Sequence, residues 1–498
     1  MAAPPEPTAP APATRLTGKL GVGSIVFMVI AAAAPLTVIA GTIPLGVGAG
    51  NGAAFPMTFV LCAVVLLLFA VGFCAMSPHV PDAGAFFTYI RHGLGRPLGL
   101  GAAFLALATY TAVQAAVYGY IGAAIDELVA SLGGPSVPWW VWTLAVVAIV
   151  GVLGYRHIEL SSRVLGVLLL AEIAIVLVLD VVVFASGGGD QGLSTALFDP
   201  VQVASGEVGI AIMFAIASFI GFEATAVFRD EARDPQRTIP RATYLALVIV
   251  GVFYAVSTWA IVSAWGDEAA VAESAANPAT FLLTTFENWL GPAGGLLVTI
   301  LLVTSLFAAI LAFHNVAARY WYALGGHGAF PGAVARTHAR HGSPHVASLT
   351  QTVLAAALVV VFAAAGLDPV AQVFAWMAGT ATLGILLLMV LTCVAVLAFF
   401  ARSRVDRRVW HTRIAPALGL IGLLVCLALT IRNFPTLIGG STGLALAIGA
   451  VLVVVFLAGV VVALVRRPAA AIPALSETSG TDSVTPGGVP GDTPRENV

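Results

Sequence analysis

Two carboxylic acids, Glu172 and Glu223, stand inside otherwise apolar runs of this sequence. An ionised side chain in an apolar interior is costly, so an acid that is kept there is a candidate for function. Such a carboxyl group can load and release a proton, or it can accept hydrogen bonds from free backbone N–H groups where a helix is interrupted. His314 stands in a third apolar run and is a further candidate for ion coupling.

The composition indicates that these residues lie within a membrane. Of 498 residues, 59% are hydrophobic and 9% are charged, and the mean hydropathy is +1.00. Average soluble domains are about half apolar and a quarter charged. The formal net charge of -2 gives no basic field that would attract nucleic acid. The partners are therefore expected to be the lipid bilayer and small solutes.

Twelve apolar segments are long enough to cross a bilayer, for which a helix needs roughly 20 residues. They lie at about residues 22–46, 53–76, 98–124, 138–155, 164–186, 207–228, 242–265, 293–318, 345–366, 371–400, 414–431 and 440–465. We therefore expect an all-α polytopic membrane protein with twelve transmembrane helices.

The positive charges predict the orientation, because loops rich in Lys and Arg stay in the cytoplasm. Of the 22 lysines and arginines, 21 fall in the two terminal segments or in every second loop, and Arg432 is the exception. Both termini are therefore predicted to be cytoplasmic. Arginine outnumbers lysine 21 to 1, which is typical of a GC-rich bacterial genome, so the membrane expected is the bacterial plasma (inner) membrane.

Two spans carry residues that interrupt helices. The first reads AAAAPLTVIAGTIPLG, with Pro35 in the middle of the span, and the sixth reads SFIGFE, with Gly221 between bulky residues. Irregular backbone at membrane depth survives only where it lines a cavity or is buried in protein. Paired breaks in helices 1 and 6 are expected if helices 1–5 and 6–10 form an inverted repeat, and ordinary proline kinks are the alternative.

The bounds of the predicted spans give the expected depth of each ionisable residue in the membrane. Glu172 lies eight residues after Val164, about 12 Å into the fifth span and near the midplane. It is either a proton-coupling group or a structural, hydrogen-bonded glutamic acid. Asp180, eight residues further on, is expected to reach water at the external face. His314, near the inner end of the eighth span, either packs or relays protons.

Glu223 has three candidate roles. It lies two residues after Gly221, where its carboxylate could cap free N–H groups of a resuming half-helix. It could also pair with a cytoplasmic arginine when the transporter closes, or take up and release a proton. The charged residues that follow it, in the stretch RDEARDPQR, mark the cytoplasmic end of the sixth span, because Pro235 and Pro240 disfavour a continuing helix.

Three blocks of the sequence carry a family resemblance. They are PDAGAFFTYIRHGLGRPLG at residues 81–99, SFIGFEA with the following DEARDPQRTIPRA at residues 218–242, and RYWYALGGHGAFP at residues 319–331. These blocks resemble, in order and in position, those of the amino acid/polyamine/organocation (APC) superfamily permeases, and the chain is similar to bacterial amino acid permeases over roughly residues 20–466. Two places depart from the family pattern, namely Ala33 to Thr37 in place of a Gly-Ser-Gly break and residues 326–328 in place of Arg-Asp-Gly.

The resemblance implies an APC/LeuT-type fold, a five-plus-five inverted repeat with broken helices 1 and 6 and two C-terminal helices. The expected regions are a disordered cytoplasmic tail at 1–19, a transport core at 20–400, helices 11 and 12 with a basic cytoplasmic loop at 401–466, and a second disordered tail at 467–498. Within the core, repeat one covers about residues 20–186 and repeat two about 205–400. The four cysteines lie in apolar runs without metal-ligand spacing and are expected to pack as core residues.

The implied function is secondary active transport of an amino acid or a related amine by alternating access. A substrate carboxylate is expected against the N–H groups of the first break, at Ala33, Ala34, Pro35, Leu36 and Thr37. The ammonium group is expected against carbonyls of Ser218, Phe219 and Ile220, beside Gly221. Phe219 and Phe222 either gate the cavity or pack around it. Weaker candidates for the cavity wall, which pack as an alternative, are Tyr110, Gln114, Tyr118 and Trp376.

The sequence favours protons as the coupling ion. Sodium would need oxygen ligands from helices 1 and 8, and Thr304 and Ser305 are expected too close to the outer half of helix 8 to supply them. No enzyme motif such as HExxH or GxSxG is present, and no cofactor or metal is expected. The alternative functions are a transporter-like sensor, a channel, or a permease for an unrelated organic solute. The protein is expected to be a monomer or a homodimer.

Overall fold

The computed structural model describes residues 20–80, 86–156, 162–225, 232–326, 328–338, 343–403 and 405–466, with residues 32, 162 and 163 described by their backbone alone. Several predictions from the sequence fall outside these residues. They concern the two tails, the beginning of the first family block at 81–85, Arg229, Asp230 and Glu231 after the sixth span, and His327.

The described chain is all-helical, as predicted, and contains no strand. The first half holds α1 (Val22–Ala33), α2 (Pro35–Gly46), α3 (Phe55–Met76), α4 (Phe86–Leu94), α5 (Arg96–Ser131), α6 (Trp139–Arg156) and α7 (Ser162–Ala185). The second half holds α8 (Pro200–Val203), α9 (Val208–Ala217), α10 (Pro235–Trp265), α11 (Asp267–Ala276), α12 (Phe281–Gly326), α13 (His345–Ala364), α14 (Ala375–Ser403), α15 (Ala415–Leu437) and α16 (Thr442–Val465).

Helices occupy all twelve predicted spans. In the described residues, eleven segments are long and apolar enough to cross a membrane, because α2 and α3 form one stretch, Pro35–His79, and α1 is too short alone. The protein is therefore a multi-pass membrane protein. The count of twelve crossings and the five-plus-five repeat stay predictions.

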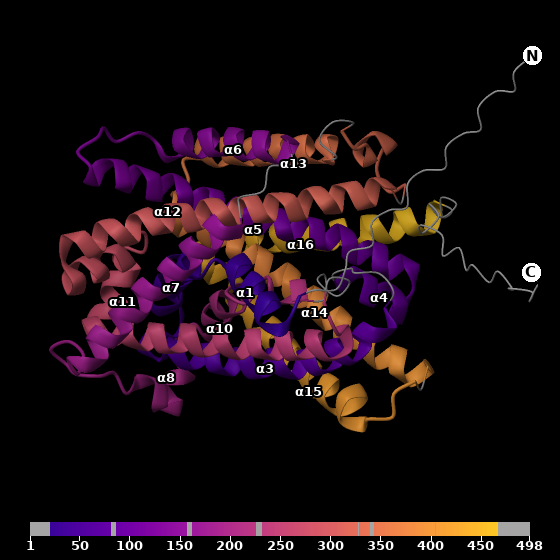
Figure 1. The fold of residues 1–498 in the computed structure, drawn as a ribbon, viewed down its shortest axis with the longest axis horizontal. Coiled ribbons are helices and arrows are strands. Elements are labelled where there is room, and N and C mark those ends of the chain that lie inside the picture. Colours follow the sequence, from indigo (N-terminus) through magenta and orange to yellow (C-terminus); the bar gives the residue numbers. More distant parts are fainter. Residues whose placement is uncertain are drawn as a thin grey trace, which may run out of the picture.

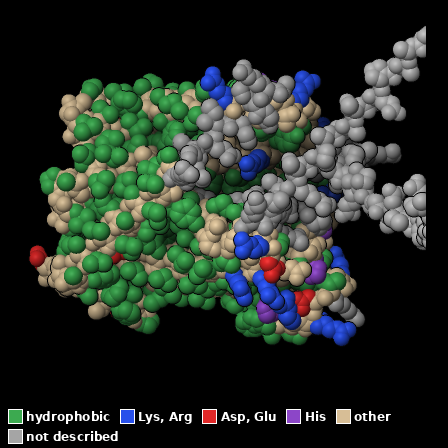
Figure 2. Space-filling view, in the orientation of Figure 1, with side chains coloured by type: hydrophobic (Ala, Val, Ile, Leu, Met, Phe, Trp, Pro, Cys, Tyr) green, Lys and Arg blue, Asp and Glu red, His purple; other side chains and the backbone are tan. Residues whose placement is uncertain are grey.

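The helices run side by side along the long axis of the molecule, with α5 in the middle and α6 beside α13 at one edge (Figure 1). In the most apolar stretch of 18 residues in each helix, 83% of the α5 residues are buried, but only 17% of the α16 residues. Apolar side chains cover the flanks of the molecule, and Lys and Arg side chains gather at one end (Figure 2). An apolar flank with cationic side chains gathered at one end is the pattern of a membrane protein whose Lys and Arg residues stay on the cytoplasmic side.

Helix 1 is broken at Ala34, between α1 and α2. Pro35 has no N–H to continue the hydrogen-bond ladder of α1, so the helix ends before it. Ala34 takes a left-handed conformation with φ 46° and ψ 73°, which no other non-glycine residue of the described chain shares. Its N–H donates to the Ala31 carbonyl at 3.2 Å.

Helix 6 is also interrupted. Its first half, α9, ends at Ala217, and residues 218–221 form a turn that Gly221 closes with φ 113°. Such a conformation strongly favours glycine, because it lacks a Cβ atom. A short 3₁₀ turn follows at residues 222–225. The two predicted breaks are thus confirmed as interruptions of helix geometry.

Substitution at the first break tests its geometry. We expect Ala34→Gly to leave the thermal unfolding midpoint unchanged or raised, because glycine adopts the left-handed conformation without the cost of about 1 kcal/mol that alanine bears. Ala40→Gly, in the buried interior of α2, should instead destabilise the protein by about 1 kcal/mol. Thermal unfolding in detergent compares the two variants, and equal destabilisation by both would contradict the strained break.

Candidate functional site

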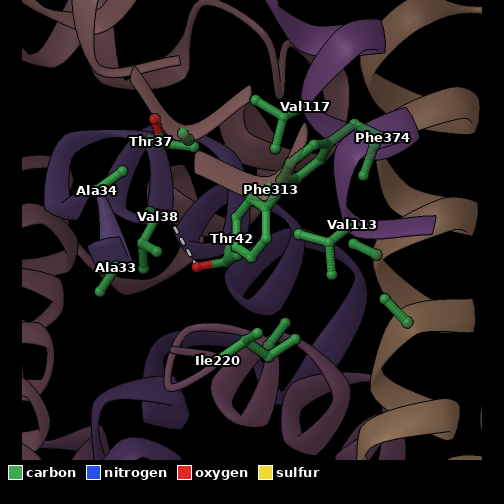
Figure 3. A pocket seen from close by; sticks show the side chains of 15 residues that line it. Ala33, Ala34, Thr37, Val38, Thr42, Val113, Val117, Ile220, Phe313 and Phe374 are labelled. Carbon is green, nitrogen blue, oxygen red and sulfur yellow. Dashed lines mark hydrogen bonds between the residues drawn. The ribbon is translucent and has the colours of Figure 1, made fainter. Parts of the chain in front are cut away.

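A cavity lies where the two breaks meet the neighbouring helices (Figure 3). The centres of water molecules can occupy about 60 Å³ of it. Thr37 and Thr42 supply its polar side chains. The apolar side chains that complete the lining come from α1, α2 and the residue between them, α5, α9, the turn after α9, α12, the π-helical segment Pro369–Phe374 and α14. They are Ala33, Ala34, Val38, Val113, Ala116, Val117, Ala217, Ile220, Ala309, Phe313, Phe374, Ala378 and Ala381.

One hydroxyl group from each of the two broken helices meets beside the cavity, at Thr42 and Ser218. The Thr42 hydroxyl donates to the Val38 carbonyl at 2.8 Å, and the Ser218 hydroxyl donates to the Phe214 carbonyl at 2.7 Å. The two hydroxyl oxygens are 3.0 Å apart. The end of α9 therefore lies next to α2, on which it packs.

Glu172 reaches the first break from α7. Its Oε2 atom accepts a hydrogen bond from the Ser305 hydroxyl at 2.9 Å and from the Leu36 N–H at 3.4 Å. The Ser305 oxygen is in turn 3.1 Å from the Thr37 hydroxyl and 3.4 Å from the Thr37 nitrogen. With 5% of its surface exposed, Glu172 is a buried acid at the amino end of α2, where the helix dipole favours negative charge.

Ser305 was considered from the sequence only as a sodium ligand and was set aside. Its place along α12 suggested a position too far toward the outer half of the span, but the structure brings it to the break. No local pattern reveals this contact, because Ser305 and Glu172 are 133 residues apart in the chain.

Glu223 closes the turn of the second break. Its Oε2 atom accepts from the Gly221 N–H at 2.9 Å, and its Oε1 atom accepts from the Tyr110 hydroxyl of α5 at 2.6 Å. Only 3% of its surface is exposed. The carboxylate therefore caps the turn itself and joins it to α5. The Tyr320 ring packs 5.6 Å from that of Tyr110, and the buried Tyr320 hydroxyl has no hydrogen-bond partner among the described residues.

The turn after α9 leaves carbonyl groups available. The Phe219 carbonyl accepts from the Phe222 N–H at 3.3 Å, whereas the carbonyls of Ser218 and Ile220 accept no hydrogen bond from the described part of the chain. Free carbonyls in a buried place favour a cationic or N–H ligand.

His314 belongs to a different cluster. It faces α5 and α13, where its Nε2 atom is 2.8 Å from the Ser348 hydroxyl and its Nδ1 atom 3.4 Å from Gln114. The Gln351 amide donates to Gln114 at 2.7 Å. The neighbouring residue, Phe313, lines the cavity, so His314 points to another side of α12.

Asp180 is not at the water-exposed position expected from the sequence. It is 3% exposed, because α10 packs over this part of α7, and its Oδ2 atom accepts from the Ser257 hydroxyl at 2.8 Å. The Oδ1 atom has no partner among the described residues.

Four of the predicted binding residues line the cavity: Ala33, Ala34, Thr37 and Ile220. The others do not, and they are Pro35, Leu36, Ser218, Phe219, Gly221, Phe222, Tyr110 and Trp376. Leu36 and Gly221 instead supply N–H groups to the two buried glutamates. Phe222 packs against Phe69 of α3, and the Phe219 ring approaches Gly251 of α10, so both pack around the site.

The side of α5 that lines the cavity consists of Val113, Ala116 and Val117. Tyr110, Gln114 and Tyr118, the weaker candidates from the sequence with packing as their alternative, do not line it. From α14, Ala378 and Ala381 line it in place of Trp376. Phe374, just before α14, packs so closely on Gly41 that a Cβ at position 41 would lie 2.5 Å from its ring.

The described residues contain no group of three or more His, Cys, Asp or Glu side chains that could hold a metal ion. The ionisable residues next to the two breaks are the two glutamates, and each is held by hydrogen bonds to one interrupted helix. The arrangement can therefore bind small charged groups and protons.

The Tyr110–Glu223 contact predicts a difference between two tyrosines. Tyr110→Phe removes the donor to Glu223 Oε1, and we expect a loss of about 1–3 kcal/mol of stability. Tyr254→Phe removes a buried hydroxyl that has no hydrogen-bond partner in the described part of the chain, so it should be neutral or stabilising. Thermal unfolding of both variants in detergent measures this difference, and equal effects would argue against the hydrogen bond.

Comparison with known proteins places the chain in a family. The model of the amino acid permease family matches residues 24–472. Over 282 residues the chain is 22% identical to the low-affinity putrescine importer PlaP of Escherichia coli (strain K12), with 55% of this chain and 60% of the relative covered. It is 26% identical over 314 residues to the branched-chain amino acid permease BcaP of Lactococcus lactis subsp. cremoris, with 59% and 65% covered.

A second permease with the name BcaP, from Bacillus subtilis, is 24% identical over 346 residues, which cover 66% of this chain and 70% of the relative. The match covers less than two thirds of the length of two of these curated relatives, namely 60% of PlaP and 65% of the Lactococcus permease. The family model, in contrast, extends over nearly the whole chain, and the protein belongs to the amino acid permease family.

Proposed function

We propose that this protein is a secondary active transporter that moves an amino acid with an apolar side chain across the membrane by alternating access, coupled to protons. The observation that carries the proposal is the apolar cavity at the meeting point of the two broken helices. Backbone groups at the breaks meet the charges of the substrate, and the apolar lining receives its side chain.

The lining favours an apolar amino acid over a diamine. Both kinds of substrate occur among the names of the relatives, in the two BcaP permeases and in PlaP. A diamine carries a second ammonium group, and none of the described residues that line the cavity is acidic and could neutralise it. A buried charge without a partner costs several kcal/mol.

The substrate's two charges have separate places. The carbonyl of Ile220, which lines the cavity, receives the ammonium group, because it accepts no hydrogen bond from the described chain. The amino end of α2, beside Ala34 and Thr37, receives the carboxylate. Glu172 exchanges a proton with the cavity as it alternates between the two sides of the membrane.

The proposed setting is the bacterial inner membrane with both termini in the cytoplasm. The Lys and Arg side chains that gather at one end of the molecule support this orientation (Figure 2). Transport proceeds as symport with protons or as exchange.

Uptake by proteoliposomes tests the substrate. Under an inward proton gradient, labelled leucine should accumulate and putrescine should not. Ala378→Trp fills the cavity and should reduce leucine uptake at least about tenfold, or about 1.4 kcal/mol. Trp376→Ala, on the same helix but outside the cavity, is the matched control and should retain uptake. Accumulation of putrescine but not leucine would overturn the apolar assignment. Binding without uptake under any gradient would favour a sensor.

Sodium is a second candidate for the coupling ion. The oxygen atoms of Glu172, Ser305 and Thr37 lie next to one another, with separations of 2.9 Å and 3.1 Å, and hard cations prefer carboxylate and hydroxyl ligands. This cluster was not expected from the sequence.

The sodium alternative has its own variant. If sodium drives uptake, Ser305→Ala should weaken the apparent sodium affinity about tenfold or more, because it removes the central oxygen. Thr304→Ala is the control, since the Thr304 hydroxyl donates to the Leu301 carbonyl and not to this cluster. Leucine uptake that is unchanged when choline replaces sodium would exclude sodium coupling.

A further inference from the structure

The amino end of α2 has its hydrogen-bond donors occupied from within the protein. Pro35 has no N–H, the Leu36 N–H donates to Glu172 at 3.4 Å, and the Thr37 N–H donates to the Ser305 hydroxyl at 3.4 Å. The Val38 N–H donates to the Ala34 carbonyl at 3.2 Å. The first turn of α2 therefore has no free donor for a substrate carboxylate.

The occupant is itself a carboxylate. Glu172 stands at the positive end of α2, where an anionic substrate group would also bind, and it is held there by Leu36 and Ser305. The contact with Leu36, at 3.4 Å, is longer than a good N–H···O bond, so it can be exchanged at low cost.

The cavity leads to the same donors. Ala34 and Thr37, on either side of Leu36, both line it, and Figure 3 shows them at the side where α1 passes into α2. A carboxylate that enters the cavity thus meets the N–H groups that Glu172 already uses. Two ionised carboxylates cannot share these donors in an apolar interior, because their charges repel each other.

We propose that Glu172 is an internal ligand that competes with the substrate carboxylate for the amino end of α2, so that the substrate binds there only when Glu172 takes up a proton. This inference rests on the proposed function and specifies how a proton is coupled to the substrate. A protonated Glu172 is neutral and a weaker acceptor, so it gives up the Leu36 N–H to the incoming carboxylate. When the substrate leaves, Glu172 releases its proton and returns.

Few other groups in the described chain act on Glu172. Of the elements packed on α7, α1 and α2 have no titratable residue, α12 presents Ser305, and α10 presents Tyr254, which is within electrostatic range of the acid. Asp180, on α7 itself, faces Ser257 of α10 two turns away. A pH dependence of carboxylate binding therefore reports on Glu172.

The substrate class follows from the competition. Ligands with a carboxylate displace Glu172 and take up a proton with them. An amine of the same shape that lacks the carboxylate leaves Glu172 in place, so its binding does not depend on the protonation of this residue. The pair of leucine and its decarboxylated analogue, 3-methylbutylamine, separates the two cases.

The test is equilibrium binding of both ligands to the full-length protein in detergent, over a pH series. In the wild type, the Kd of leucine should rise about tenfold for each pH unit above the titration of Glu172, as linkage to one proton requires. In Glu172→Gln, which imitates the neutral acid, the Kd should vary less than about twofold. Asp180→Asn, which neutralises a buried acid on the same helix away from the break, is the control and should keep the wild-type dependence.

A second measurement needs no variant. At a pH where the leucine affinity depends on pH, leucine should bind with the uptake of about one proton from a weakly buffered solution, and 3-methylbutylamine with none. A Kd for leucine that does not change with pH would overturn the competition, as would equal proton uptake with the amine. Leucine uptake driven by a proton gradient, together with binding that does not depend on pH, would leave the proposed function intact and remove this inference alone. Absence of binding and uptake for every amino acid would instead overturn the proposed function.

Discussion

The constraint on which the site depends is that a helix interrupted inside a membrane must find partners for its backbone. Water cannot supply them in the hydrocarbon region, and each unpaired N–H or carbonyl group costs several kcal/mol. At the first break, Glu172 and Ser305 supply acceptors for α2. At the second break, Glu223 supplies one for Gly221. The buried acids are thus parts of the breaks, and their cost is offset by the backbone groups they satisfy.

The long helix α12 connects the parts of the site. Ser305 contacts the acid of the first break, Phe313 lines the cavity, and the Tyr320 ring packs on the tyrosine that holds the acid of the second break. Ser305 and Tyr320 are fifteen residues apart, which is about 22 Å along a helix. A shift of α12 along its axis therefore changes the surroundings of both acids at once. This arrangement suits a transporter in which the two sides of the site open in turn.

The sequence predicted the features that depend on local chemistry. Pro35 and Gly221 indicate the breaks, because proline lacks an N–H group and glycine permits backbone conformations that other residues avoid. Glu172 and Glu223 are conspicuous because acids are rare in apolar spans. The face of α5 that lines the cavity was not predictable, because this helix is buried on nearly all sides and its pattern does not distinguish a cavity from a helix contact. Tyr110 and Trp376 were weaker candidates for the lining, with packing as the alternative, and valine and alanine line the cavity instead.

Long-range contacts set the remaining details. The partners of Glu172 are 133 and 136 residues away in the chain, and the burial of Asp180 depends on the way α10 packs on α7. Neither can be read from spacing within one segment. Ala34 is a further example, since alanine gives no sign of the left-handed backbone that the following proline and the packing impose on it.

The contact between Gly41 and Phe374 has a consequence for how the size of the cavity can change. Because the ring rests on the bare backbone of position 41, any larger residue there would displace Phe374, which lines the cavity. Position 41 is not in the lining and carries no charge, so such a change would leave both breaks and both acids as they are. A substitution at position 41 can therefore change the size of the cavity without touching the residues that hold the two interrupted helices.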